Sequence, residues 1–171
     1  MSDPAVENTP IKENNTPSKP IKKWLTWASY LAIPVIFYFA NVEFQSYLGR
    51  QALSNIGIEL LNIDQAMTKA AAENKYVLAD MSAIWCATCR KLDSEVFSDE
   101  RVKKAINERF VFARVEYESD EGESFMERYQ VQAFPTVLVL DSEGKKLSRL
   151  PFTLDPEAFI EILKKIPSSS T

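Results

Sequence analysis

The sequence predicts an α/β fold in which helices flank one mixed β-sheet, preceded by a single membrane-spanning helix. Two observations predict this architecture. Between residues 57 and 167, short apolar runs alternate with stretches rich in helix formers. Near the N-terminus, a long apolar stretch carries no charge. A chain of 171 residues has room for one medium-sized domain with such additions.

The segments before the domain differ sharply in composition. Residues 1–23 are polar and contain four prolines, so we expect a disordered tail. Residues 24–42, WLTWASYLAIPVIFYFANV, contain no charge and as a helix would extend ~28 Å, close to the thickness of a bilayer core. We expect an uncleaved anchor; a buried helix and a cleaved signal peptide are the alternatives. A linker or helical stalk at 43–56, the domain at 57–167 and a disordered tail at 168–171 complete the chain.

The charges that flank the apolar stretch predict its orientation. Four lysines lie between residues 12 and 23, whereas Arg50 is the only basic residue among the twenty that follow the stretch. The positive-inside rule therefore predicts a single-pass protein of a bacterial inner membrane, with its N-terminus in the cytoplasm. Residues 43–171 would then lie in the periplasm, which is an oxidising compartment.

The first half of the domain begins with three expected elements. The run IGIELLNI, residues 56–63, is short and apolar and predicts an edge strand. Residues 64–74 are rich in helix formers, and Asp64 is the expected N-cap. The apolar run KYVLADMS, residues 75–82, predicts a buried strand.

The middle of the domain contains two further helical segments and a second strand. We expect a helix from Cys86 to about Ser94, continued over residues 99–109. The run FVFARVEY, residues 110–117, predicts a second core strand, and residues 123–130 predict a short helix.

The end of the domain predicts a hairpin and a closing helix. The strands TVLVLD and KKLSRL are joined through Ser142-Glu143-Gly144, which favours an antiparallel pair. Residues 155–166 predict the last helix, with Asp155 as its cap and Pro156 at its first position.

The composition excludes several classes of function. The net charge of −4 leaves no basic surface for nucleic acid. The chain has no histidine, which removes the commonest general base and the commonest metal ligand. Two cysteines are too few for a disulfide framework. Chemistry in this chain must therefore use thiols or carboxylates.

The only two cysteines lie in the stretch IWCATCR, and their setting predicts a redox pair. Cys86 follows a strand and begins a helix, where free amides and the helix dipole stabilise a thiolate, so Cys86 is the expected attacking sulfur. Cys89 lies one turn further on the same face, shielded and suited to resolve a mixed disulfide. Two inert buried thiols, or a zinc site completed by other ligands, are the alternatives.

At this point the sequence resembles a known family. Residues 77–102, VLADMSAIWCATCRKLDSEVFSDERV, resemble the active-site stretch of thioredoxin-fold proteins, and are most similar to the C-terminal thioredoxin domain of the DsbD thiol:disulfide interchange proteins. The resemblance covers residues ~57–167 in the β-α order of that fold. Three separated matches carry it: Trp85-Cys86-x-x-Cys89, then Asp80 six residues before Cys86, then Phe134-Pro135-Thr136.

The resemblance implies a role for each matched residue. Cys86 and Cys89 would form the redox disulfide, with no cofactor and no metal. Asp80 lies in an apolar strand, so burial should raise its pKa and let it accept the proton of Cys89; the alternative is a carboxylate that only satisfies local amides. Pro135 would have a cis peptide bond. Substrate would be bound by Trp85, Phe134, Pro135 and Thr136, with the backbone at Phe134 pairing with an extended segment.

The sequence departs from the family pattern at two places. Ala87-Thr88 stands where typical thioredoxins have Gly-Pro, which leaves the direction of electron flow open. Leu150-Pro151-Phe152 stands near the groove where many thioredoxin-like domains have a glycine, so substrate choice is expected to differ.

The expected function is that of a membrane-anchored thiol:disulfide oxidoreductase. It would reduce disulfides of extracytoplasmic proteins, with apocytochromes as one substrate class, and would be re-reduced by a membrane electron donor of the DsbD-like type. A disulfide oxidase or isomerase, a non-enzymatic thioredoxin-like docking module of a membrane complex, and a thiol copper carrier remain the alternatives.

Overall fold

The computed structural model describes residues 21–167, with side chains at Tyr30 and from Ala32 onward. The expected tail at 168–171 and residues 1–20 of the expected tail at 1–23 lie outside the described residues, whereas residues 21–23 belong to the first helix. The chain divides into two units, one ending at Tyr38 and one running from Phe39. The second unit contains the sheet, its flanking helices and the last turns of the first helix.

The first helix, α1 (Ile21–Ile56), extends through the apolar stretch and contains Pro34. Its large apolar side chains between Tyr30 and Phe39 are exposed wherever they are described. Within the part of the chain that the structure describes, no helix is long and apolar enough to cross a membrane. The predicted span at 24–42 falls partly on residues 24–29 and 31, whose side chains lie outside that part.

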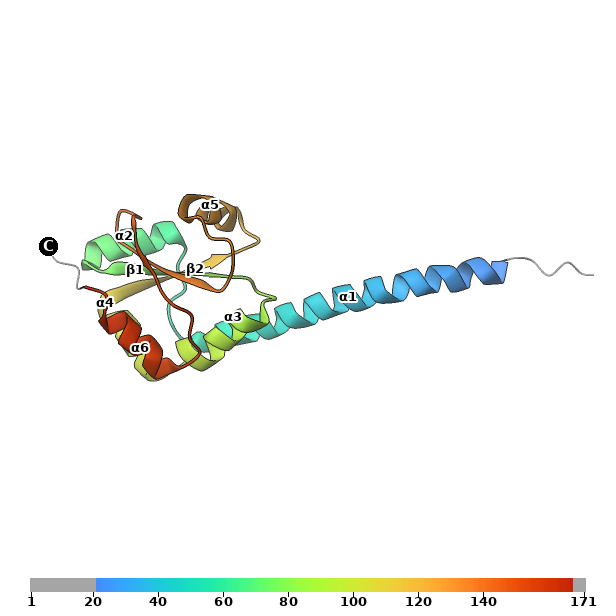
Figure 1. Ribbon diagram of the computed structural model, residues 1–171, viewed down its shortest axis with the longest axis horizontal. Helices are drawn as coiled ribbons and strands as arrows, with labels where there is room; N and C mark the ends of the chain where they lie inside the picture. Colours follow the sequence, from blue (N-terminus) through green and yellow to red (C-terminus); the bar gives the residue numbers. More distant parts are fainter. Residues whose placement is uncertain (1–20, 168–171) are drawn as a thin grey trace, which may run out of the picture. The chain divides into compact units, whose positions relative to one another are not determined.

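A four-stranded mixed sheet forms the centre of the second unit (Figure 1). Its strands lie in the order β2-β1-β3-β4, and β1 pairs parallel with β2 and antiparallel with β3. The strands β3 and β4 form the predicted hairpin. The bounds are β1 (Tyr76–Ser82), β2 (Phe110–Glu116), β3 (Thr136–Leu140) and β4 (Lys146–Arg149).

Helices cover both faces of this sheet, as Figure 1 shows. One face packs against α2 and α5, and the other against α4 and α6. The bounds are α2 (Ile63–Glu73), α3 (Ala87–Leu92), a π-helical turn η1 (Asp93–Phe97), α4 (Glu100–Arg109), α5 (Asp120–Tyr129) and α6 (Pro156–Lys164). The predicted α/β fold with a mixed sheet is therefore confirmed.

The alternation of side chains along β1 determines which residues reach each layer. Val77 and Ala79 face the α2/α5 layer, whereas Leu78 faces the α4/α6 layer. Asp80, two positions after Leu78, shares the face of Leu78 because side chains alternate along a strand. A carboxylate thus lies under the helical layer that begins at the cysteines.

Two expectations at the start of the domain are wrong in detail. Residues 56–63 form no regular strand among the described residues, and only Leu61 bridges to Ala113 of β2. The N-cap of α2 is Asn62, not Asp64: its side chain accepts from the Gln65 amide in a capping box, and Asp64 lies in the first turn.

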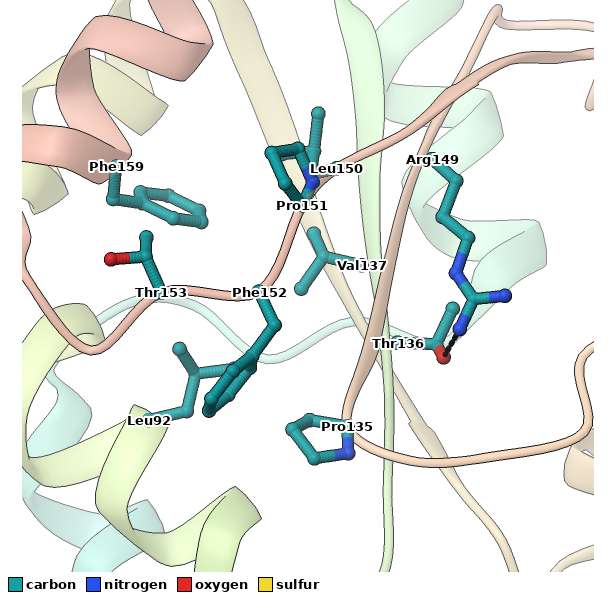
Figure 2. A pocket seen from close by; sticks show the side chains of 10 residues that line it. All are labelled: Leu92, Pro135, Thr136, Val137, Arg149, Leu150, Pro151, Phe152, Thr153 and Phe159. Carbon is teal, nitrogen blue, oxygen red and sulfur yellow. Dashed lines mark hydrogen bonds between the residues drawn. The ribbon is translucent and has the colours of Figure 1, made fainter.

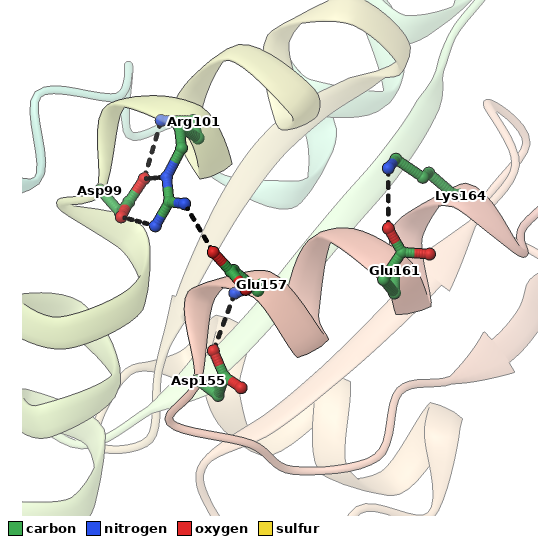
Figure 3. A network of polar contacts seen from close by, with 6 residues as sticks. All are labelled: Asp99, Arg101, Asp155, Glu157, Glu161 and Lys164. Atoms are coloured by element: carbon green, nitrogen blue, oxygen red, sulfur yellow. Dashed lines mark hydrogen bonds and ion pairs between the residues drawn. The ribbon is translucent and has the colours of Figure 1, made fainter.

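The N-terminal ends of α4 and α6 are joined by exposed polar contacts (Figure 3). Arg101 pairs with Asp99, the N-cap of α4, and its Nη1 lies 3.0 Å from Glu157 Oε1 in the first turn of α6. Asp155 caps α6 as predicted, accepting from the Glu157 amide at 2.9 Å. Exposed pairs of this kind contribute little stability, so the apolar core determines how these helices pack.

The last turns of α1 belong to the packed domain. The residues of this segment that the domain covers recur at helical spacing, from Ser46 through Gly49 and Ala52 to the fully buried Ile56. Leu53 packs on the same core cluster as Ile56. The segment that the sequence suggested as a linker or stalk is therefore a docked helix. We call residues 45–56 of α1 the docked segment.

Candidate redox site

The cysteine pair lies where β1 gives way to α3. Cys86 is the N-cap residue of α3 and forms a disulfide with Cys89, with the two Cα atoms 5.3 Å apart. The Cys89 amide donates to Cys86 Sγ at 3.1 Å, so a helix N–H points at this sulfur. Cys86 is 8% exposed and Cys89 only 2%. Cys86 is thus the sulfur that a partner can approach, and a thiolate there would be stabilised by the helix terminus.

Three aromatic side chains surround the approach to the disulfide. Trp85 packs on the cysteine cluster, and its ring meets Phe134 edge-on at 5.5 Å between centroids. Tyr117, at the end of β2, contacts both rings, at 6.4 Å from Trp85 and 5.0 Å from Phe134. Tyr117 is 37% exposed and was not predicted from the sequence. We call Trp85, Tyr117 and Phe134 the aromatic platform, because together they offer an apolar surface to a bound segment.

The peptide bond between Phe134 and Pro135 is cis, as the resemblance implied. Pro135 lines a pocket of about 340 Å³ that also contains Phe152, which is 55% exposed (Figure 2). Thr136 is only 2% exposed, and its hydroxyl donates to the Ala133 carbonyl at 2.6 Å and accepts from Arg149 at 3.0 Å. The hydroxyl of Thr136 therefore holds the loop that contains Pro135.

A buried carboxylate lies beneath the cysteine helix. Asp80 is 1% exposed, and burial raises its pKa from the ordinary value of 3.8 to about 7. Arg114, opposite Asp80 in the parallel β1–β2 register, opposes this rise, with Nη1 3.3 Å from Asp80 Oδ2. Oδ1 of Asp80 is buried and has no hydrogen-bond partner among the described residues. One oxygen of this carboxyl is therefore open to a proton.

A second buried acid shares the same guanidinium. Asp93 is 3% exposed and pairs with Arg114 through both of its oxygens. Burial raises the pKa of Asp93, and Arg114 again opposes the rise. Since two carboxylates share one cation, the fully ionised cluster carries a net negative charge, which favours one bound proton. We call Asp80, Asp93 and Arg114 the acid cluster.

The loop before Cys86 is connected to this cluster. The Ile84 amide donates to Glu116 Oε1 at 2.8 Å, and Glu116 follows Arg114 by two residues on the same face of β2. Burial raises the pKa of Glu116, whereas the Ile84 amide and Arg114 lower it. The residues leading into the cysteine pair are thus tied to the strand that carries the buried charges.

Sequence reasoning missed Asp93, Arg114 and Glu116, although signals were present. Asp93 follows Cys89 by four residues, so both lie on one helical face. Arg114 is the one charge in the apolar run of residues 110–115, the same signal that pointed to Asp80. Among the described residues, no histidine, cysteine or acidic side chains form a group of three that could hold a metal ion.

Comparison with known proteins agrees with this geometry. Residues 63–167 match the model of the thioredoxin-like domain. The chain is 31% identical over 108 residues to the thiol:disulfide interchange protein DsbD of Photorhabdus laumondii, covering 61% of this chain and 18% of that protein. The corresponding protein of Haemophilus influenzae is 27% identical over 127 residues, covering 71% and 22%. The chain therefore spans about a fifth of the length of these curated relatives.

Two solved structures are similar to this chain in fold and in sequence. A thioredoxin from Thermus thermophilus superposes with a TM-score of 0.57 at 25% identity, covering 63% of this chain and 85% of that one. A putative disulphide-isomerase from Bacteroides thetaiotaomicron gives 0.53 at 32% identity, covering 64% and 88%. Since the family model matches more than half of the sequence, over residues 63–167, the chain belongs to the family of thioredoxin-like domains.

Proposed function

We propose that this protein is a membrane-anchored thiol:disulfide oxidoreductase that reduces disulfides of extracytoplasmic proteins. One arrangement carries the proposal: the Cys86–Cys89 disulfide lies at the start of α3, Phe134 before cis-Pro135 packs on it, and α3 leads directly into Asp93 of the buried acid cluster. A shallow sulfur, a deeper sulfur and a proton acceptor are the three parts that thiol–disulfide exchange needs.

The proposed reaction begins with the reduced pair. The Cys86 thiolate attacks one sulfur of the substrate disulfide, a mixed disulfide forms, and the other substrate sulfur leaves as a thiolate that takes up a proton. Cys89 then loses its proton to Asp80, and its thiolate attacks Cys86 Sγ. The second substrate sulfur leaves, so the substrate gains two electrons and the Cys86–Cys89 disulfide is formed. The aromatic platform and Pro135 would hold the substrate segment in an extended conformation.

The oxidised pair must be re-reduced in each cycle. In an oxidising compartment this requires an electron donor reached through the membrane, and the likeness to DsbD supports a donor of that type. Proteins with exposed disulfides, apocytochromes among them, are the proposed substrates.

The reduction potential of the Cys86–Cys89 pair tests the proposed direction. We expect the full-length chain to equilibrate with glutathione or dithiothreitol at about −230 mV or below, because a reductant must lie on the thioredoxin side of the scale. A value near about −120 mV would make the pair an oxidant and reverse the mechanism. Cys89→Ala serves as a control, because it cannot form the intramolecular disulfide.

An oxidase or isomerase is the second candidate. The 32% identity to the putative disulphide-isomerase of Bacteroides thetaiotaomicron favours it, and Ala87-Thr88 between the cysteines leaves the direction of electron flow open. The same potential distinguishes the two candidates, and isomerase activity of the pre-reduced protein would in addition restore a scrambled disulfide protein with no net consumption of thiols.

The proposed location rests on the sequence of residues 24–42 and on the lysines before it. We propose a single-pass inner-membrane protein with its N-terminus in the cytoplasm and its thioredoxin-like domain in the periplasm. Alkaline phosphatase fused after Thr171 is expected to be active, since it folds only in the periplasm, and the chain is expected to sediment with membranes after a carbonate wash. A fusion active only as a cytoplasmic reporter would overturn the topology.

A further inference from the structure

The docked segment contacts the cysteine-bearing stretch on both sides of the cysteine pair. Before the pair, α1 lies so close to the active-site loop that a Cβ placed on Gly49 would be 2.0 Å from the Ile84 carbonyl oxygen. After the pair, Arg90 Nη1 donates to the Gln45 carbonyl at 3.4 Å. Ile84 and Arg90 bracket Cys86 and Cys89 in the sequence, so the segment supports the redox loop at both ends.

The same helix covers two members of the acid cluster, Asp93 and Arg114. Gly49 and Leu53 of α1 and Arg90 of α3 line a void with Asp93 and Arg114, and this void has no room for a water-sized probe. Ser82, Ala83, Ile84 and Glu116 complete its wall. The charged groups around this void come from α3, η1 and β2, whereas α1 contributes only apolar surface and backbone. On this side, Gly49 and Leu53 of α1 lie over Asp93 and Arg114.

We propose that the docked segment is a working part of the redox site: Gly49 lets it lie on the Ile84 carbonyl, and Leu53 keeps water away from Asp93 and Arg114, the buried pair whose guanidinium also faces Asp80. Gly49 and Leu53 are then positioning residues for the proton acceptor. The effect on catalysis that we expect from this positioning rests on the proposed function. Residues 45–56 precede the matched family range of 63–167.

The physical argument is desolvation. A buried carboxyl resists ionisation because it has left water, and burial is the largest cause of the raised pKa of Asp80. Arg114 lowers this pKa, while Asp93 and Glu116 raise it further. A gap under α1 would admit water to Asp93 and Arg114, the neighbours of Asp80, and the less desolvated site would bring the pKa of Asp80 back towards its ordinary value. The resolving step would then lose its proton acceptor near neutral pH.

The test titrates Asp80 in the full-length chain by the 13C chemical shift of its carboxyl carbon. Gly49→Ala adds a Cβ that would clash with the Ile84 carbonyl, so it forces α1 away from the active-site loop. Leu53→Ala removes three side-chain carbons and so enlarges the void. We expect both variants to titrate at least one pH unit below wild type. Asn55→Ala is the matched control: it is also a change to alanine, on the exposed side of the same helix, and should leave the titration unchanged.

A purely structural role for the segment gives a different result. Alanine favours helix more than glycine, so Gly49→Ala should strengthen α1 itself, and lower stability alone would not move the titration of Asp80. Unchanged titration in folded Gly49→Ala and Leu53→Ala would overturn the inference. If Gly49→Ala does not fold, the titration of Asp80 in Leu53→Ala alone decides, and an unchanged titration there overturns the inference.

A second readout separates this inference from the proposed function. The release of glutathione from a preformed mixed disulfide at Cys86 reports the resolving step. We expect Gly49→Ala and Leu53→Ala to release it several-fold more slowly at pH 7 and Asn55→Ala at the wild-type rate. A shifted Asp80 titration with unchanged release supports the shielding by the docked segment and overturns the role of Asp80 as proton acceptor.

Discussion

Replacing Cys89 with alanine is expected to turn the protein into a trap that holds its substrate as a mixed disulfide on Cys86. The physical reason is the order of the two sulfurs: Cys86 lies at the start of α3 and is the more exposed, whereas Cys89 lies one turn deeper at 2% exposure. Without Cys89, attack still occurs but nothing resolves the intermediate. Non-reducing gels of cells expressing the variant should show covalent complexes that disappear with dithiothreitol, and turnover should fall by on the order of 10³ or more.

The matched control is Cys86→Ala, which should lose turnover equally and trap nothing, because the buried Cys89 is not reached by substrate. The two single variants therefore separate attack from resolution. Complexes formed by Cys86→Ala rather than by Cys89→Ala would reverse the two roles, and complexes formed by neither would leave the pair without an exchange function. Mass spectrometry of the trapped complexes would name the substrates and test whether apocytochromes are among them.

Most of the sheet could be predicted from the sequence, because β1, β2 and β3 are mainly apolar runs bounded by turns. The run before residue 64 could not, since an apolar period alone does not show whether a partner edge is available. Only Leu61 pairs there, and Ile58 goes into the core instead. The sequence also did not predict that residues 45–56 pack on the domain, because this packing depends on a close backbone contact between Gly49 and Ile84.

The residues of the candidate site likewise divide into those that the sequence predicted and those that only the fold brings together. Cys86, Cys89 and Pro135 were found because their spacing or their resemblance is local in the sequence. Arg114 lies opposite Asp80 only in the β1–β2 register, which sequence periodicity does not specify. Asp93 reaches Arg114 from a π-helical turn where the sequence predicted the end of a regular helix. Which charges pair across a sheet depends on the register of its strands. The sequence alone therefore does not predict that Arg114 pairs with Asp80 and Asp93.

Replacing Asp80 with asparagine is expected to slow thiol–disulfide exchange near neutral pH by about a hundredfold, the lower end of what a positioned proton acceptor contributes. Asparagine keeps the shape of the side chain but cannot take the proton of Cys89. Wild-type turnover should rise with pH around a midpoint near 7, where Asp80 ionises. In the variant that inflection should disappear, and the rate should recover only at the higher pH where Cys89 ionises unaided. Stopped-flow measurement of tryptophan fluorescence across about pH 5–9 would record both profiles on either side of that pKa.

The same substitution is expected to stabilise the oxidised protein at alkaline pH. A carboxyl whose pKa is raised from 3.8 to about 7 in the folded chain stabilises the fold in its protonated form, and this contribution is lost as the pH rises through 7. With ~1.4 kcal/mol per pH unit, the ionised Asp80 costs ~4 kcal/mol at pH 8 and close to nothing at pH 4. Urea unfolding of Asp80→Asn and wild type should therefore differ at pH 8 and coincide at pH 4.

The two effects of Asp80→Asn have opposite signs, and this separates a functional carboxylate from one that only satisfies local amides. A residue retained for stability would lower both stability and rate when replaced, whereas a buried proton acceptor raises stability and lowers rate. Glu143→Gln, an exposed acid in the β3–β4 turn, is the matched control and should change neither quantity. A variant that is less stable than wild type at pH 8, with an unchanged exchange rate, would remove Asp80 from the mechanism. The observed burial, with Oδ1 unpaired among the described residues and two acids sharing Arg114, favours the proton acceptor.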